Sequence, residues 1–361
     1  MTLVLDDSLF DDPQRLLAED QGGALRQAAL AGAQVRSAWE SAAEADLGDL
    51  GEQRPRALVL LARPGVAPAA FRLLAALVAP TAPCPVFTAE VMPSWVGPLD
   101  VVLAHTEQEG DSELAESVAE ATRRGASVVL TCGPEGPVAA AGAGRAKMLS
   151  PRVPVPAPLS FAHVLAGGLR VFVELGLLRC DGDELADELD AEAGRSRPDN
   201  EPATNPAKSL ALRLADRTPL LWGLDPISTA AGAHGAFALA AHAGVPCDVA
   251  DLAHAATRPA LHRAATSGGS ERDLFADPED QAAALRVFLL SARYDVRAEA
   301  GERAAIESLP GADLVTPGEP VRDDAVLRAA VLALRFDLAA VYLGLAAGTA
   351  HGSGPQALAL R

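Results

Sequence analysis

A short acidic run brings several chemically active side chains close together in the chain. His105, Glu107, Glu109 and Asp111 alternate through it, with Gly110 before the last. Oxygen ligands at this spacing suit a hard cation, so a metal site is one interpretation. We favour a solvated acidic turn, because nothing elsewhere in the sequence supplies a matching set of ligands. We therefore predict no metal site.

Two histidines of the second half also share a face. His234 and His242 lie two turns apart on one expected helix, so their side chains project in the same direction. They could transfer protons, although a helix cap or a contact between subunits explains the same spacing.

Length and composition exclude several classes of protein. The chain has 361 residues, of which 49% are hydrophobic and 22% charged, enough for two domains with buried cores. A net charge of −18 argues against nucleic acid or membrane lipid as a main partner, because either needs a basic face. The four cysteines lie far apart and predict neither a disulfide framework nor a zinc site. No continuous apolar run reaches about 18 residues and the first residues are acidic, so we expect a soluble, cytoplasmic protein.

The first half alternates strands and helices. Continuous apolar runs such as RALVLLA are typical of strands buried on both faces of a parallel sheet, and helical periodicity separates them. The expected strands are 56–62, 85–88, 100–105 and 126–131, and the expected helices are 23–43, 67–79, 111–124 and 161–178.

The same alternation restarts after an acidic, proline-containing stretch at 181–204, which we interpret as a short helix and a linker. The expected helices there are 206–215, 227–243, 251–256, 296–308 and 321–345, and the expected strands are 219–223, 245–249, 286–291 and 313–316. The stretch 266–278 is expected to be a polar loop. The pattern predicts an α/β fold of two similar halves, with domains at 1–180 and 205–361.

Four segments, taken together, resemble one family. They are MPSWVGP at 92–98, RGASVVLT at 124–131, NPAKSLALRLADRTPLLWG at 205–223 and FDLAAVYLGLAAG at 336–348. Their order and spacing resemble proteins with two SIS (sugar isomerase) domains, of the bifunctional phosphoglucose/phosphomannose isomerase type, in its actinobacterial branch. The resemblance implies two tandem SIS domains, each a five-stranded parallel sheet flanked by helices in a three-layer sandwich, and a homodimer.

The resemblance also implies a chemistry, the interconversion of phosphorylated aldoses and ketoses without a metal or other cofactor. Such an enzyme holds the phosphate with backbone N–H groups at a helix N-terminus and with hydroxyl side chains. A glutamate moves the proton between two carbons, a histidine assists ring opening, and a cation stabilises the enediolate.

The binding loops of the family are altered in this chain. The first loop, GxGGS, falls on 63–67, where Gly65 is retained and Ala67 replaces the serine. Arg63 could contact an anion there instead, but an ordinary turn after a strand explains the same residues.

The hydroxyl-rich phosphate cradle of the family falls on the acidic run that begins at His105. Four carboxylates, those of Glu107, Glu109, Asp111 and Glu113, now surround the start of the following helix. Carboxylates there satisfy the helix dipole and repel a phosphate, by roughly 3 kcal/mol per pair of unit charges at about 5 Å. We predict that no phosphate binds in this loop as it does in the family.

The catalytic positions implied by the resemblance are also changed. The arginine of the family falls on Leu159 and its glutamate base on Ala241. The ring-opening histidine is retained as His254 with Asp251 nearby, although a structural histidine is an equally simple interpretation. The carboxy-terminal lysine of the family falls on Arg361, which a frayed terminus would leave without a role.

Together these substitutions favour a non-catalytic or weakly active homologue that binds a sugar phosphate or another ligand and has a regulatory role. Two alternatives stay open. One is an active isomerase with a rebuilt site that uses His254, His242 or Glu107, and the other is a dimeric interaction protein without a ligand. We expect a homodimer that associates through the long apolar helices, including the one at 161–178 or the one at 321–345.

Overall fold

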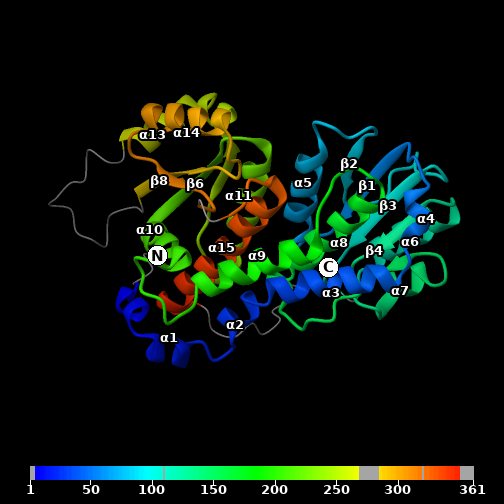
Figure 1. Cartoon of the computed structure of the whole chain (residues 1–361), viewed down its shortest axis with the longest axis horizontal. Coiled ribbons are helices and arrows are strands. Elements are labelled where there is room, and N and C mark those ends of the chain that lie inside the picture. The colour runs from blue at the N-terminus through cyan, green and yellow to red at the C-terminus, as the bar shows by residue number, and fades with distance from the viewer. Residues whose placement is uncertain (1–4, 109, 268–283, 319–320, 350–361) are drawn as a thin grey trace. The chain divides into compact units, whose positions relative to one another are not determined.

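The computed structural model describes residues 5–108, 110–267, 284–318 and 321–349 (Figure 1). The chain forms two compact units. One, which we call the central unit, is Leu30–Asp190. The other, which we call the split unit, combines the residues up to Ala29 with those from Ala191 onward. The amino-terminal segment, placed by the sequence analysis with the first domain, therefore groups with the second half.

The central unit is built on a parallel five-stranded sheet in the order β2-β1-β3-β4-β5. Its strands are β1 (Ala57–Ala62), β2 (Val86–Ala89), β3 (Asp100–His105), β4 (Ser127–Leu130) and β5 (Lys147–Met148). Every residue of β1 and β3 is buried, which is why these two strands have continuous apolar sequences rather than alternating ones.

Helices cover both faces of this sheet. α6 and α7 pack on the face that presents Val59, Val102 and Val128, while α5 and α8 pack on each other at the opposite face, where α3 also contacts α8. The helices are α3 (Ala31–Glu44), α4 (Gly48–Gly51), α5 (Ala67–Val78), α6 (Ser112–Arg123), α7 (Gly136–Gly142), α8 (Phe161–Glu174) and α9 (Gly182–Arg195), with the 3-10 turn η2 (Ala157–Leu159). The linker expected at 181–204 is thus largely helical, and α9 continues from the central unit into the split unit.

The split unit has a parallel sheet in the order β7-β6-β8-β9. Its strands are β6 (Arg217–Gly223), β7 (Asp248–Asp251), β8 (Ala284–Leu290) and β9 (Asp313–Val315). Four strands are found among the described residues, where the family resemblance implied five. α12, α13 and α14 pack near Trp222 and Leu289 on one face, and α11 packs on the other.

The helices expected at 206–215, 227–243, 251–256, 296–308 and 321–345 are found in the split unit, all but 296–308 with shifted ends, whereas the helical segments at 7–11, 13–19 and 259–267 were not expected. The helices of this unit are η1 (Asp7–Asp11), α1 (Pro13–Glu19), α2 (Ala24–Ala28), α10 (Pro206–Leu214), α11 (Pro226–Ala238), α12 (Leu252–Ala256), α13 (Pro259–Ser267), α14 (Val296–Ser308) and α15 (Ala325–Ala346), with the π-helical turn η3 (Leu239–Ala243) after α11. The single helix expected at 23–43 is wrong, because α2 ends before α3 begins. Part of the polar loop expected at 266–278 lies outside the described residues, and its first residues end α13.

The long apolar helix α15 is the core element of the split unit. It packs against α10, α11 and α2, and its only charged residues, Arg328, Arg335 and Asp337, are buried with the rest. Its length and mean hydropathy of 1.7 are sufficient for a membrane span, which the sequence analysis did not expect, but the whole apolar window is buried inside the protein. Internal packing therefore explains the apolar sequences of α8 and α15, which were our reason for expecting a dimer. The homodimer and the cytoplasmic location stay predictions.

Candidate functional site

The order of the strands marks one end of the central sheet as the place for a site. The chain passes from β1 outward to β2 and from β3 in the opposite direction to β4, so the connections diverge at the carboxyl ends of β1 and β3. Ligands of open α/β sheets bind at such a switch point. The structure places both predicted loops there, since Arg63–Ala67 follow β1 and the acidic run follows β3.

Glu107 connects the two loops. Its Oε1 accepts a hydrogen bond from the Val66 N–H at 3.2 Å, at the start of α5. The same oxygen lies 3.2 Å from the Ser160 Oγ, whose hydroxyl is shared with the carbonyl oxygen of Ala157 at 2.8 Å. Burial raises the pKa of Glu107, and the hydrogen bonds from Val66 and Ser160 oppose that rise. A side chain remote in sequence thus occupies the N-terminus of α5.

Gly65 is required for this arrangement. Its φ is +134°, in the region that favours glycine, and a Cβ at this position would lie 2.3 Å from the Glu107 Oε2. The retention of Gly65, noted from the sequence, therefore has a structural reason, the close approach of the Glu107 carboxylate. Ala67 is buried in the first turn of α5, and Gly110 lies in an open turn where a Cβ would meet nothing within 4 Å.

His105 lies beside this carboxylate and is buried. Its Nδ1 is 3.0 Å from the Thr131 Oγ1 and 3.2 Å from the Thr131 carbonyl oxygen, which also contacts His163 Nε2 at 3.0 Å. Its Nε2 is buried without a hydrogen-bond partner among the described residues, 3.9 Å from the Glu107 Oε1. Burial lowers the pKa of His105 to about 3; the nearby His163 adds to this effect, and the Thr131 hydrogen bond opposes it. His105 is therefore neutral at pH 7.

Arg63, predicted as an anion contact, is instead paired with carboxylates of the protein itself. Its Nε donates to the Asp111 Oδ2 at 2.9 Å, and its Nη2 lies 2.7 Å from the Glu113 Oε2. Asp111 also accepts from the Leu114 N–H at 2.9 Å, which caps α6. The N-terminus of α6 and the nearest cation are thus both neutralised by the protein itself.

In the split unit, α11 and α14 are each capped by the residue directly before the helix. At the carboxyl end of β6, Asp225 accepts hydrogen bonds from the Ile227 N–H at 2.8 Å and the Ser228 N–H at 3.0 Å, capping α11. The Ser228 Oγ donates to Asp225 and accepts from the Ala292 N–H after β8. Asp295 caps α14 in the same way as Asp225 caps α11.

The residues implied by resemblance in the second half are not gathered into one site. Asp251 caps α12, a helix of five residues, and His254 is exposed on it, after the carboxyl end of β7. Ala241 is exposed in η3, about 22 Å of helix away from the start of α11 and thus near the opposite ends of the strands. Arg361 lies outside the described residues.

His234 is part of a buried hydrogen-bonded pair. Its Nε2 lies 2.7 Å from the Asp337 Oδ1 of α15, and its side chain is fully buried, so neither a helix cap nor a subunit contact explains it. Burial lowers the pKa of His242, which the charge of Asp337 opposes. The sequence signal for this pair was present as an aspartate within the apolar sequence of α15, but the interpretation missed it.

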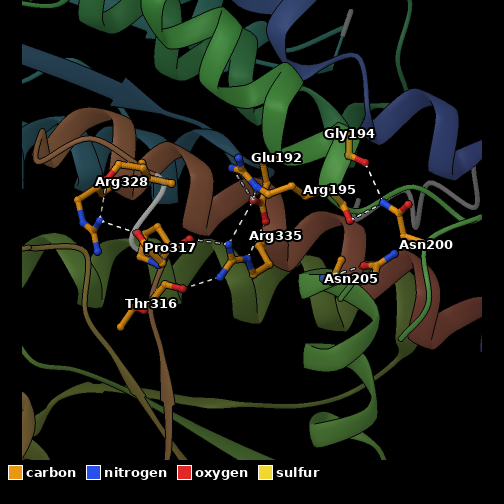
Figure 2. Close-up of polar contacts among 12 residues, drawn as sticks. Glu192, Gly194, Arg195, Asn200, Asn205, Thr316, Pro317, Arg328 and Arg335 are labelled. Atoms are coloured by element: carbon orange, nitrogen blue, oxygen red, sulfur yellow. Dashed lines mark hydrogen bonds and ion pairs between the residues drawn. The ribbon is translucent and has the colours of Figure 1, made fainter. Parts of the chain in front are cut away.

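A second group of charged side chains surrounds the buried carboxylate of Glu192 (Figure 2). The Arg335 guanidinium contacts both oxygens of Glu192, at 2.6 and 3.2 Å, and Arg195 contacts Glu192 at 3.0 Å. Arg335 also donates to the carbonyl oxygens of Thr316 and Pro317, directly after β9. These contacts use the donors of Arg335 internally and give it a structural role.

Two further expectations concern Leu159 and a metal site. Leu159 is buried in η2, next to Ser160, so the position implied for an arginine lies near Glu107 but presents an apolar side chain. Among the residues that the structure describes, no group of three or more His, Cys, Asp or Glu side chains is arranged to hold a metal ion.

Comparisons with known proteins agree with this architecture. No family model matches the sequence, and a search of curated proteins by sequence finds no match. Among solved structures, the C-terminal domain of glucosamine-fructose-6-phosphate aminotransferase from Francisella tularensis is similar at 10% identity and a TM-score of 0.60, over 90% of this chain and 96% of that one. Tagatose-6-phosphate ketose/aldose isomerase from Escherichia coli is similar at 14% identity and a TM-score of 0.60, over 89% of this chain and 92% of that one.

The chain therefore has the α/β fold of tandem SIS domains, with parallel sheets of five and four strands. At these identities the similarity establishes the fold alone. The fold implied by the resemblance is confirmed, and the isomerase branch is left as a proposal.

Proposed function

We propose that this chain is a non-catalytic or weakly active homologue of the phosphosugar isomerases, related to the phosphoglucose/phosphomannose isomerase branch, and that it acts by binding and regulation. The support comes from the similarity in fold to a ketose/aldose isomerase together with the chemistry at the strand ends. A fold alone does not determine activity, so the residues at the strand ends decide the proposal.

One observation carries the proposal. At the switch points of both sheets, helix N-termini that could receive a phosphate receive carboxylates of the protein instead, from Glu107 at α5, Asp111 at α6, Asp225 at α11 and Asp295 at α14. A carboxylate in that position satisfies the helix dipole and repels a second anion. A sugar phosphate that binds this protein would have to place its phosphate elsewhere.

An active isomerase with a rebuilt site is the second candidate. The observation in its favour is that burial raises the pKa of Glu107, as a general base working near neutral pH requires, and that His105 lies within 4 Å of it. A dimeric interaction protein without a ligand is the third candidate. The exposed side chains of Phe87, Trp95 and Leu99 on the central unit are the observation in its favour.

A coupled assay of the interconversion of mannose 6-phosphate, glucose 6-phosphate and fructose 6-phosphate tests the proposal. The protein, Glu107→Gln and His254→Ala are measured together. We expect no turnover above background, since loss of a general base alone removes a factor of about 10² to 10⁴. Turnover of about 1 s⁻¹ that collapses in Glu107→Gln or in His254→Ala would establish an enzyme. Turnover that is equal in all three proteins would indicate a contaminant.

Binding is tested separately by thermal shift with a panel of sugars and sugar phosphates. The proposal expects a ligand that raises the unfolding temperature without being turned over. If no compound in the panel shifts that temperature, and light scattering shows a dimer, the interaction protein becomes the better interpretation.

A further inference from the structure

We propose that the Glu107 carboxylate is the built-in occupant of an oxyanion site in the central unit, and that this site takes a small, singly charged oxyanion once the side chain is withdrawn. The inference rests on the proposed function, in which the native protein holds no phosphate at this switch point. The new element is that the oxyanion site is still present and that the Glu107 side chain occupies it.

The donors around Glu107 come from separate elements and meet at one oxygen. The Val66 N–H at the start of α5 and the Ser160 hydroxyl before α8 both lie 3.2 Å from Oε1. α5 has 12 residues, so its N-terminus contributes a positive dipole end as well as the N–H. The other oxygen, Oε2, lies over the Cα of Gly65 in a space that any Cβ would fill. These features form a cradle of the size of one carboxylate.

His105 supplies the independent observation. Its side chain is only 5% exposed, and its Nε2 lies 3.9 Å from the Glu107 Oε1 and has no hydrogen-bond partner within the described part of the chain. Because its Nδ1 is held by Thr131, the ring presents Nε2 to the carboxylate. A buried polar atom without a partner costs free energy. An anion oxygen satisfies Nε2 when that nitrogen carries the proton, and the hydroxyl of dihydrogen phosphate satisfies it when it does not.

The surrounding charges determine which anion fits. Asp111 and Glu113 are both paired with Arg63, which leaves one net negative charge among these three groups. A dianion would be repelled by that charge, whereas a monoanion replaces the charge of Glu107 one for one. The site is therefore suited to formate, acetate or dihydrogen phosphate rather than to a doubly charged phosphate ester.

The test is the thermal unfolding of Glu107→Ala in sodium formate, acetate or phosphate at pH 6, compared with sodium chloride of equal ionic strength. We expect 100 mM formate to raise the midpoint of Glu107→Ala by about 3 °C or more beyond chloride. The native protein and Glu107→Gln, which keeps the cradle filled, should shift by less than about 1 °C. Glu113→Ala, which removes a neighbouring exposed carboxylate, controls for a general loss of negative charge and should resemble the native protein.

The arms of the experiment separate the possible results. A formate effect in Glu107→Ala that is reduced by the additional change Ser160→Ala supports the cradle, and the order of formate, acetate and phosphate identifies the preferred anion. An equal response of Glu107→Ala to formate and to chloride overturns the inference. If Glu107→Ala unfolds in chloride, its refolded yield is measured in both salts, and equal yields overturn the inference too. Isomerase turnover by the native protein would contradict the proposed function, and the result of this titration would not.

Discussion

The two units bring helix N-termini to the carboxyl ends of parallel strands, but they neutralise them in different ways. In the split unit, the caps of α11 and α14 are the aspartates directly before each helix. In the central unit, the N-terminus of α5 receives Glu107 from the loop after another strand. A local cap forms with its helix, whereas the remote cap needs the whole sheet in place and buries a carboxylate to make it. Among the described residues, the central unit therefore differs in capping one helix with a buried carboxylate from a distant loop, although its α6 has a local cap like those of the split unit.

The two units also differ in their buried polar groups. The central unit buries the histidines 105 and 163 around Thr131, and burial lowers the pKa of both. The interior of the split unit holds ion pairs, most fully the Glu192–Arg335 contact (Figure 2). Removing one partner should therefore be most costly in the split unit, and changing pH should affect the central unit more.

The largest effect is expected for Glu192→Ala. Glu192 is fully buried, and its removal leaves Arg335 as a buried charge without its carboxylate partner. Breaking a buried pair on one side costs about 3–5 kcal/mol of unfolding free energy. Urea unfolding followed by fluorescence measures it. Arg195→Ala is the matched control, because Arg195 contacts the same carboxylate from a partly exposed position and should cost about 1 kcal/mol. Equal losses of unfolding free energy in the two variants would show that the buried Glu192–Arg335 pair contributes no more than the partly exposed Arg195 contact.

A smaller loss is expected for Gly65→Ala. The new Cβ would clash with the Glu107 Oε2, and the φ of +134° is unfavourable for alanine, so we expect a loss of about 2–3 kcal/mol. Gly110→Ala in the neighbouring loop is the control, because its Cβ meets nothing within 4 Å. The combination Gly65→Ala with Glu107→Ala should recover part of the loss. Without such recovery, the strain would come from the backbone of Gly65 alone.

Most of the fold could be predicted from local sequence, and particular elements show why. β1 and β3 are continuous apolar runs between turn residues, and α14 begins after an aspartate at the residue that was expected. The predictions missed α7, a helix of seven residues that contains three glycine or proline residues, and β5, a strand of two residues. Such short elements form because the sheet edge and α6 provide packing, which no local pattern reports.

The site could be predicted only in part. The acidic run and Gly65 were identified from their residue types, and the prediction that no phosphate binds at that loop still awaits a test. Ser160, Thr131 and His163 were missed, because each belongs to the site only through contacts between distant segments. Arg63 was predicted to be available, and the structure pairs it with Asp111 and Glu113 because all three lie at the same strand ends.

The dependence of the free energy of unfolding on pH should also distinguish the two units. In the folded protein the pKa of His105 is about 3, against about 6.5 in an unfolded chain, so below pH 6.5 the unfolded state binds more protons. Stability is then present above pH 6.5 and falls by about 1.4 kcal/mol per pH unit as the pH decreases toward 3. His105→Asn should reduce this slope in urea unfolding curves collected between pH 7 and pH 5, and the lowered pKa values of His163 and His242 should leave a remainder. The pKa of Glu107 is raised in the folded protein, so above the ordinary pKa of a glutamate the folded state binds more protons than the unfolded state. Glu107 therefore adds stability as the pH decreases and opposes the effect of His105. Glu107→Gln should make the loss of stability toward acid pH steeper. A slope unchanged in both variants would mean that neither group is buried as described.

The smallest effect is expected at the local cap of the split unit. Asp225 accepts hydrogen bonds from the Ile227 and Ser228 N–H groups, and replacing an aspartate cap by alanine costs about 1 kcal/mol. Asp225→Asn keeps an acceptor oxygen at the same place and should cost less than about 0.5 kcal/mol, because asparagine is as good a cap. Chemical unfolding of Asp225→Ala, Asp225→Asn and the native protein measures both values. If asparagine is as destabilising as alanine, the charge of Asp225 matters more than its hydrogen bonds, and the local cap would resemble the remote carboxylate of Glu107. If the two variants separate as expected, a cap adjacent in sequence needs only an acceptor, in contrast to the buried carboxylate of Glu107 that reaches α5 from another loop.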